Sequence, residues 1–242
     1  MLRFGKNYVA VSEVAMQFFC EKKVELMYLH GKVPKEEKII GADGHEKLLE
    51  EAMIKPREEI MREIGSGKPI FVNEFFVYTK YNGIIIMGSI DRTFFAKKKP
   101  YYVFEYKFTK HWFNSPFPDV HVQGNLYCFL LDEVGFDTSE LKYVLVLIDP
   151  RCKDCENLKN CESELTLQAI LDRSYTHVCK DNKGLRSTIY RYNRERAIRE
   201  LDRALEYWLN KRPAIPTSKP FKCKTCEYRD VCPEKLDEVF FR

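Results

Sequence analysis

Hydrophobic residues recur at helical spacing in the first quarter of the chain. Residues 12–30 open on Ser12, which can cap a helix, and Gly31 follows as a typical helix stop. A second helical pattern covers residues 44–65 and is interrupted at Pro56. Both patterns predict helices whose apolar stripes face the core.

The middle of the chain is rich in β-branched and aromatic residues. Residues 70–79 and 84–91 flank Asn82-Gly83, a strong hairpin signal, and a further turn over 97–100 precedes a third strand over 101–108. Beyond them the pattern predicts a helix at 120–133, strands at 141–149 and 187–192, and a helix at 194–211. This order of elements implies a mixed α/β fold, with a central mixed sheet flanked by helices.

The length and composition suit one domain. The chain has 242 residues, 45% of them hydrophobic, which is enough for a single sizeable core over residues 1–242. Residues 150–184 carry cysteines and little apolar periodicity, so we interpret them as a cysteine-containing insertion with few ways to bury itself. Residues 212–220 hold three prolines and form a linker to a short tail.

Charge and hydropathy restrict the function only weakly. The net charge of +4 permits a nucleic-acid partner without requiring one. The basic runs at 97–99 and 191–199, taken alone, are better explained as a solvated turn and a solvated helix face. No apolar stretch could cross a membrane and the first residues have no signal core, so we expect a cytoplasmic protein without a membrane partner.

Three charged residues in the predicted strands carry the clearest chemistry. Glu105 and Lys107 are two apart on one strand and share a face, while Tyr106 points away. Asp91 ends the preceding predicted strand, which a turn returns alongside. A solvated cross-strand ion pair is the plain alternative. Neighbouring carboxylates repel unless a cation lies between them, and such oxygen ligands suit Mg²⁺ or Mn²⁺.

A metal in this position would favour phosphodiester hydrolysis. It would acidify a bound water, and Lys107 could orient or deprotonate that water or neutralise the phosphate. His45 opens a helix upstream and could be a further metal ligand or an ordinary helical residue. Gln123 and Tyr127 are four apart on one helix face, which could also be plain helix surface.

The order His, Asp, Glu-x-Lys, Gln-x-x-x-Tyr resembles the RecB-type branch of the PD-(D/E)XK nucleases. The resemblance covers about residues 12–232 and implies a restriction-endonuclease-like core. It implies metal binding by His45, Asp91, Glu105 and the Tyr106 carbonyl, catalysis by Lys107, and support of the site and the DNA by Gln123 and Tyr127.

Nine cysteines are a surplus for a chain expected in a reducing compartment. They indicate metal ligands or reactive thiols before disulfides, unless the source grows very hot. In residues 221–232, Cys223, Cys226 and Cys232 need a fourth ligand, for which Cys20 is the candidate. Four thiolates can hold a [4Fe–4S] cluster or zinc, and the spacing alone does not choose.

One N-terminal cysteine with a C-terminal Cys-x2-Cys-x5-Cys-Pro resembles the iron–sulfur nucleases of the RecB branch. These include the CRISPR-associated protein-four family and the nuclease part of the Okazaki-fragment nuclease–helicase. The short chain, without a helicase motor, is more similar to the CRISPR-associated family. The resemblance implies a [4Fe–4S] cluster that joins the N-terminal helix to the tail.

A second cysteine set repeats the spacing of the tail. Cys152, Cys155 and Cys161 are followed by Cys179 as a possible fourth ligand, which predicts a structural zinc. Surface thiols or a disulfide are the alternatives. The repeat leaves open which triplet joins Cys20, and the Cys-Pro ending favours the tail. Cys128 lies among apolar residues and is expected in the core.

The leading hypothesis is a metal-dependent DNA exonuclease acting on single-stranded or frayed ends. Its expected context is CRISPR spacer acquisition, with the CRISPR integrase as partner. The alternatives are a repair or virus-encoded RecB-like nuclease, and a DNA-binding integrase partner with a vestigial site. Trp112, Phe113 and Phe117 follow the Glu-x-Lys strand and could stack on bases or pack on the core.

Overall fold

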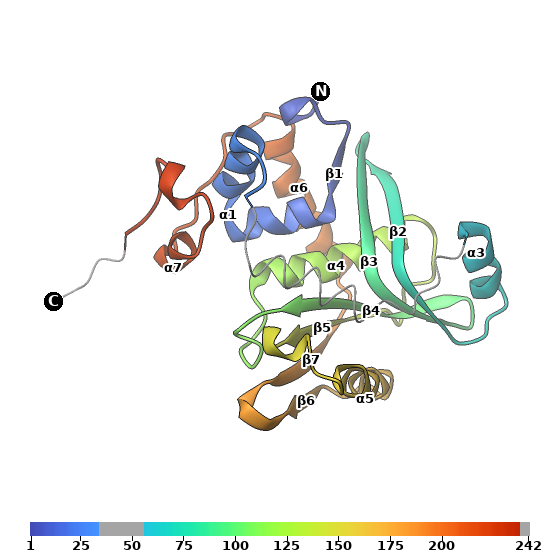
Figure 1. The fold of residues 1–242 in the computed structure, drawn as a ribbon. Coiled ribbons are helices and arrows are strands. Elements are labelled where there is room, and N and C mark those ends of the chain that lie inside the picture. Colours follow the sequence, from blue (N-terminus) through green and yellow to red (C-terminus); the bar gives the residue numbers. More distant parts are fainter. Residues whose placement is uncertain (34–55, 238–242) are drawn as a thin grey trace.

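A computed structural model describes residues 1–33 and 56–237 of the chain. In this part of the chain one sheet has the strand order β1-β3-β4-β5-β7-β6, with β2 paired to β3 (Figure 1). The strands are β1 Tyr8–Ala10, β2 Ile70–Tyr81, β3 Ile84–Ala96, β4 Lys99–Phe108, β5 Lys142–Ile148, β6 Tyr175–Val178 and β7 Gly184–Arg191. The helices are α1 Val11–His30, α3 Arg57–Gly65, α4 Pro118–Glu133, α5 Leu158–Ile170, α6 Arg194–Trp208 and α7 Pro220–Lys224.

The sheet mixes parallel and antiparallel pairs, as the order of elements predicted. β2, β3 and β4 form an antiparallel meander, and β4 pairs in parallel with β5. α4 connects β4 to β5, because a parallel pair needs a crossover rather than a tight turn. The predicted mixed α/β architecture is therefore confirmed.

α4 lies between the sheet and a layer formed by α1 and α6 (Figure 1). Residues 122–131 of this helix are all buried, so the helix is enclosed on every side instead of facing solvent along one stripe. The large core on this face also contains Trp208 of α6, whose indole N–H donates to Gln17 of α1 at 2.9 Å. Cys128 is fully buried here, as expected.

A second core lies on the opposite face of the sheet. There α5 buries Leu158, Leu165 and Ala169 against residues of β4 and β5, including Phe104 and Tyr106. The prediction that residues 150–184 have few ways to bury themselves is wrong. Three apolar positions at helical spacing pack α5 against the sheet. The polar residues between them make this spacing hard to recognise in the sequence.

Two element boundaries differ from the prediction in ways that affect the site. β3 continues through Asp91 to Ala96, so Asp91 lies within the strand and not at its end. α1 begins at Val11 rather than being capped by Ser12, and the Glu13 carboxylate accepts the Ala10 backbone N–H at 2.9 Å. The same helix is interrupted at Cys20, whose backbone is extended.

No helix in the described part of the chain has the length and apolarity to cross a membrane.

Candidate active site and cysteine clusters

Asp91, Glu105 and Lys107 come together where β3 and β4 separate. Regular pairing of these strands ends at Arg92 opposite Phe104. One step further, the Asp91 carboxylate replaces a backbone acceptor and takes the Tyr106 N–H at 2.8 Å. Lys107 Nζ lies 2.6 Å from Glu105 Oε1 on the same face of β4. The Glu105 side chain is 1% exposed and that of Lys107 is 37% exposed, so the ion pair leads from the core to the surface.

The electrostatics of this group favour a bound cation. Burial raises the pKa of Asp91 to about 6, although Lys107 and the Tyr106 N–H both lower it. Burial by itself lowers the pKa of Lys107, but the charges of Glu105 and Asp91 outweigh it and raise the pKa above its usual value, so the ammonium form is favoured. A half-buried carboxylate that ionises with difficulty beside a second one is stabilised by a divalent ion. The oxygen donors present therefore fit Mg²⁺ or Mn²⁺.

Glu74 is a further carboxylate at this site that the sequence patterns did not reveal. It lies in β2 between the pairs Asn73–Arg92 and Phe75–Ile90, which places it across from Asp91. Its φ of +50° is rare for a residue with a side chain and marks local strain. The Ser89 hydroxyl donates to its carboxylate at 3.0 Å, and its charge raises the pKa of Asp91.

Gln123 and Tyr127 of α4 reach the same site from the helical side of the sheet. Gln123 Nε2 donates to the Tyr127 hydroxyl at 3.1 Å. Burial raises the pKa of Tyr127, and the charges of Glu105 and Asp91 raise it further. The phenol therefore stays protonated beside the carboxylates. His45 lies outside the described residues.

Tyr106 anchors the strand from the opposite face. Its side chain points away from the Glu105–Lys107 face, and its hydroxyl donates to Glu162 of α5 at 2.5 Å. Glu162 also accepts Arg92 Nη1 at 2.6 Å and the Thr166 hydroxyl at 2.7 Å. This buried network fixes the residue that lies between Glu105 and Lys107.

A pocket beside Lys107 is lined by the loop that follows β4. His111, Phe117 and Asp119 contribute to its wall. Phe117 is 41% exposed, whereas Trp112 is 4% exposed and hydrogen-bonds to Asp149. Trp112 therefore packs on the core. Phe113 and Phe117 are exposed, so these two rings are available to stack on bases.

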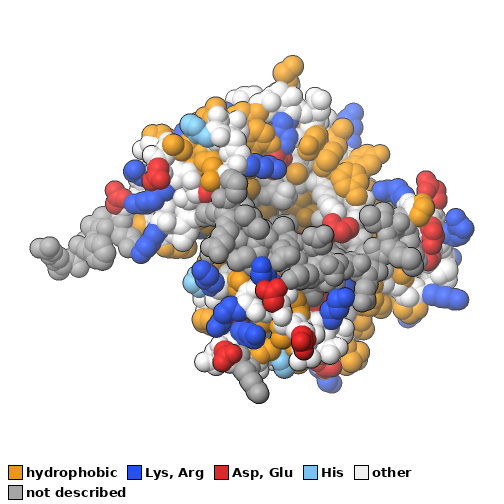
Figure 2. Space-filling view, viewed as in Figure 1, with side chains coloured by type: hydrophobic (Ala, Val, Ile, Leu, Met, Phe, Trp, Pro, Cys, Tyr) orange, Lys and Arg blue, Asp and Glu red, His pale blue; other side chains and the backbone are white. Residues whose placement is uncertain are grey.

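Ion pairs account for much of the second basic run. Arg194 contacts Asp132 and Glu133, and Arg196 Nε lies 2.8 Å from Glu200. Figure 2 shows lysine and arginine side chains interspersed with aspartate and glutamate over the visible face. The arginines of this run that lie on α6 are therefore paired charges rather than an uncompensated patch.

The four cysteines predicted to share a site at the termini line one pocket. They are Cys20, Cys223, Cys226 and Cys232, around a space of about 360 Å³ that opens in part to solvent. The pocket forms because α7 lies beside α1 (Figure 1) at the break in that helix. Lys222 Nζ donates to the carbonyls of Phe18 at 3.1 Å and Phe19 at 2.9 Å. The lysine thereby holds the tail against the interrupted turn.

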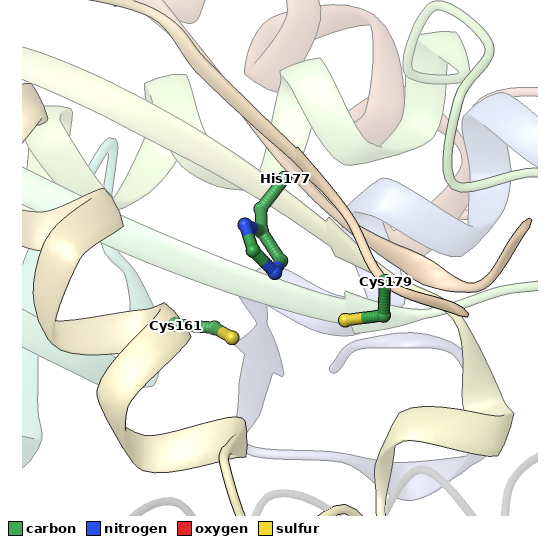
Figure 3. Close-up of side chains that lie close together, drawn as sticks. All are labelled: Cys161, His177 and Cys179. Atoms are coloured by element: carbon green, nitrogen blue, oxygen red, sulfur yellow. The ribbon is translucent and has the colours of Figure 1, made fainter.

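The second cysteine set differs from the prediction. Cys161 and Cys179 lie close together, but the third member of the close group is His177 (Figure 3), and Cys152 and Cys155 are outside it. The sequence carried a signal for the histidine, because His177 and Cys179 are two apart at the end of a strand. All nine cysteines lie in the described ranges and none forms a disulfide.

Comparisons with known proteins identify one family. A sequence model described as the PD-(D/E)XK nuclease superfamily matches residues 19–233. No curated protein sequence matches the chain significantly. The crystal structure of SSO0001 is 15% identical, with a TM-score of 0.49 over 96% of this chain and 88% of that chain. An alkaline exonuclease (LHK-Exo) from Laribacter hongkongensis is 14% identical, with a TM-score of 0.43 over 85% of this chain and 87% of that chain. Likenesses this distant carry no argument about activity.

We predict that Gly88→Ala disturbs the site through Tyr127. A Cβ at Gly88 would lie 2.6 Å from Tyr127 Cε1, so the ring must move or the strand must shift. We expect a loss of about 1–3 kcal/mol in the free energy of unfolding, measured by denaturant titration. Gly65→Ala is the control, because nothing lies within 4 Å of its added Cβ. Equal stability of the two variants would contradict the close contact.

Proposed function

The chain belongs to the PD-(D/E)XK nuclease superfamily, and from this premise we propose that it is a metal-dependent DNA exonuclease acting on single-stranded or frayed ends. The observation that carries the proposal is the convergence of Asp91, Glu105 and Lys107 where β3 and β4 separate, with Lys107 Nζ 2.6 Å from Glu105. Burying several charged side chains together costs stability unless they are compensated, so a group of this kind in a sheet with apolar cores on both faces favours a functional role.

The metal ligands in this proposal are Asp91, Glu105 and the backbone carbonyl of Tyr106. The N–H and C=O of a strand residue point the same way. Because the Tyr106 N–H is directed to Asp91, its carbonyl faces the same side. Glu74 adds a nearby carboxylate, and His45 is proposed as a further ligand on the resemblance alone. A bound Mg²⁺ or Mn²⁺ would supply an acidified water and offset charge on the phosphate.

The protein side chains supply the charge, the hydrogen-bond donors and the support of the strand. The raised pKa of Lys107 keeps it an ammonium ion, which can donate to a phosphate oxygen or orient the attacking water. The protonated Tyr127 hydroxyl and the Gln123 side-chain amide provide hydrogen-bond donors behind the carboxylates. The Tyr106–Glu162 hydrogen bond holds the strand between the two catalytic positions.

Single-stranded ends are the proposed substrate because of the pocket beside Lys107. Phe117 is partly exposed in its wall, and His111 lies next to it with ring centroids 6.4 Å apart. Aromatic rings of this kind can stack on unpaired bases without sequence preference. A strand entering along this loop would bring its backbone to Lys107.

We propose a [4Fe–4S] cluster for the pocket lined by Cys20 and the tail cysteines. A zinc ion about 2.3 Å from four sulfurs would hold them about 3.8 Å apart. In the described part of the chain, no three of these sulfurs lie within 4.8 Å of one another. The choice of a cluster over a zinc ion rests on the resemblance of the cysteine pattern to the iron–sulfur nucleases. The cluster would join α1 to the tail and stabilise the ends of the chain together.

The cellular role that we propose is the trimming of DNA precursors in CRISPR spacer acquisition, with the integrase as partner. It is supported by the resemblance of the cysteine pattern to the CRISPR-associated family and by the gathering of the four cysteines around one pocket. Co-migration of the purified chain with the integrase on a sizing column tests this role. Separate migration would favour a nuclease that acts alone.

Substitution of the charged group should abolish cleavage. We expect Glu105→Ala and Lys107→Ala each to slow cleavage of a linear single strand on the order of 100-fold or more, because both act on the charge that develops at the phosphate. Release of labelled nucleotides in Mn²⁺ measures the rate, and a chelator should stop it. Glu195→Ala is the matched control, since this side chain is 89% exposed on α6.

The same assay separates an exonuclease from an endonuclease. A circular single strand has no end and should resist cleavage. Full metal-dependent activity in both folded variants would refute the catalytic assignment. Cleavage of the circle with an intact dependence on Glu105 would leave a nuclease but overturn the requirement for ends.

Phe117→Ala should weaken binding of a short single strand by about 1–3 kcal/mol, because stacking on one ring contributes this much. Fluorescence anisotropy in a chelator measures affinity without cleavage. Leu171→Ala is the control, since this side chain is 53% exposed at the end of α5. Trp112→Ala should instead lower the free energy of unfolding by about 3–5 kcal/mol, as for other buried aromatic side chains. Unchanged affinity in Phe117→Ala would place the strand elsewhere.

The cluster predicts iron in the purified chain. Anaerobic preparation should yield about four iron atoms per chain, with broad visible absorption, and Cys226→Ser should lose most of both. Cys128→Ser is the control, because Cys128 is fully buried in the core away from the pocket. A colourless chain that contains zinc at this pocket would refute the cluster and favour a zinc ion.

A further inference from the structure

Cys161, His177 and Cys179 form a compact group outside the catalytic site. One sulfur or ring nitrogen from each lies within 4.8 Å of the others, and the side chains point toward one another (Figure 3). Cys161 belongs to the first turns of α5, His177 to β6, and Cys179 directly follows β6. Soft thiolates with an imidazole are a ligand set that zinc prefers.

Backbone hydrogen bonds and strand pairing fix the segments that carry these ligands. In the β6–β7 hairpin, His177 pairs with Leu185, and the Cys179 N–H donates to the Lys183 carbonyl at 2.7 Å. A Cβ at Gly184 would lie 2.0 Å from the His177 carbonyl oxygen, so only glycine allows this close approach. The Cys161 N–H donates to the Asn157 carbonyl at 3.0 Å. The site is thus assembled from a helix start and a hairpin that are both already ordered.

The loop before α5 holds two candidates for a fourth ligand, Cys152 and Cys155. The Cys161 thiol interacts with those of Cys179 and Cys155, and so does the Cys152 thiol. Cys152 is 2% exposed, and its thiol is directed to the Gly184 carbonyl, with Sγ and oxygen 3.7 Å apart. Cys155 is more exposed and lies in the short turn between Cys152 and α5. It can therefore move toward the group more easily than Cys152.

We propose that Cys155, Cys161, His177 and Cys179 bind one Zn²⁺ ion in a closed structural site. Four protein ligands leave no open position for catalysis, which is typical of structural zinc. The ligand set revises the one expected from the sequence, because His177 replaces Cys152. The inference is independent of the nuclease activity and of the pocket at Cys20.

The position of the ion would link α5 to the strand that carries the catalytic residues. Glu162 is the residue next to Cys161, and it accepts hydrogen bonds from Tyr106 at 2.5 Å and Arg92 at 2.6 Å. A metal bond at Cys161 restrains the start of this helix and therefore the carboxylate that holds Tyr106. The ion would act as a positioning element behind β4, without contact with the substrate.

The test is the metal content of the full-length chain, with iron and zinc measured separately by mass spectrometry. We expect about one zinc per chain, lost in Cys161→Ser and His177→Ala and kept in His177→Cys, because cysteine can replace histidine as a ligand. Cys155→Ser should lose the ion, whereas Cys152→Ser should keep it. Cys226→Ser should keep zinc while it loses iron, which separates this site from the terminal pocket.

Circular dichroism identifies variants that fail to fold, and the pair His177→Ala and His177→Cys is compared only when both are folded. Zinc that remains at one per chain in folded His177→Ala overturns the proposal. So does a wild-type chain that contains no zinc after growth in zinc-supplemented medium. A Cys161–Cys179 disulfide, seen as a chain lighter by two hydrogens, would also overturn it.

Discussion

The hydrogen bond from the Tyr106 N–H to the Asp91 carboxylate is the interaction on which the rest of the site depends. At 2.8 Å it replaces a backbone pair at the point where β3 and β4 separate. The separation leaves room for charged side chains in a sheet that is otherwise packed on both faces. Because a side chain supplies the missing acceptor, the strands can part without leaving a buried N–H unsatisfied.

The two faces of β4 carry side chains of different kinds. Glu105 and Lys107 share the face toward α4, where Tyr127 lies close to Gly88 and the carboxylates. Tyr106 points to the other face and is held by Glu162 of α5. Alternation along one strand therefore places the charged side chains on one side and the anchoring tyrosine on the other. The segment that we expected to be a loosely packed insertion thus forms part of the support of the site.

Cysteine groups join parts of the chain that are distant in sequence. Cys20 interrupts α1 and meets the tail, where Lys222 binds the carbonyls of Phe18 and Phe19. Cys161 meets His177 and Cys179 across the space between α5 and β6. Metal binding at either group would therefore join segments that are far apart in the sequence.

The sequence by itself determined the mixed sheet through the order of its elements. It also determined the shared face of Glu105 and Lys107 and the meeting of Gln123 with Tyr127, because these two follow from local repeats of two and about four residues. The tertiary structure decided the rest. Glu74 reaches the site through pairing with β3, Trp112 is buried although its loop could have faced solvent, and His177 joins two cysteines from separate elements. A local pattern states which face a side chain takes, but not which distant segment covers that face, since this depends on how all strands and helices pack together.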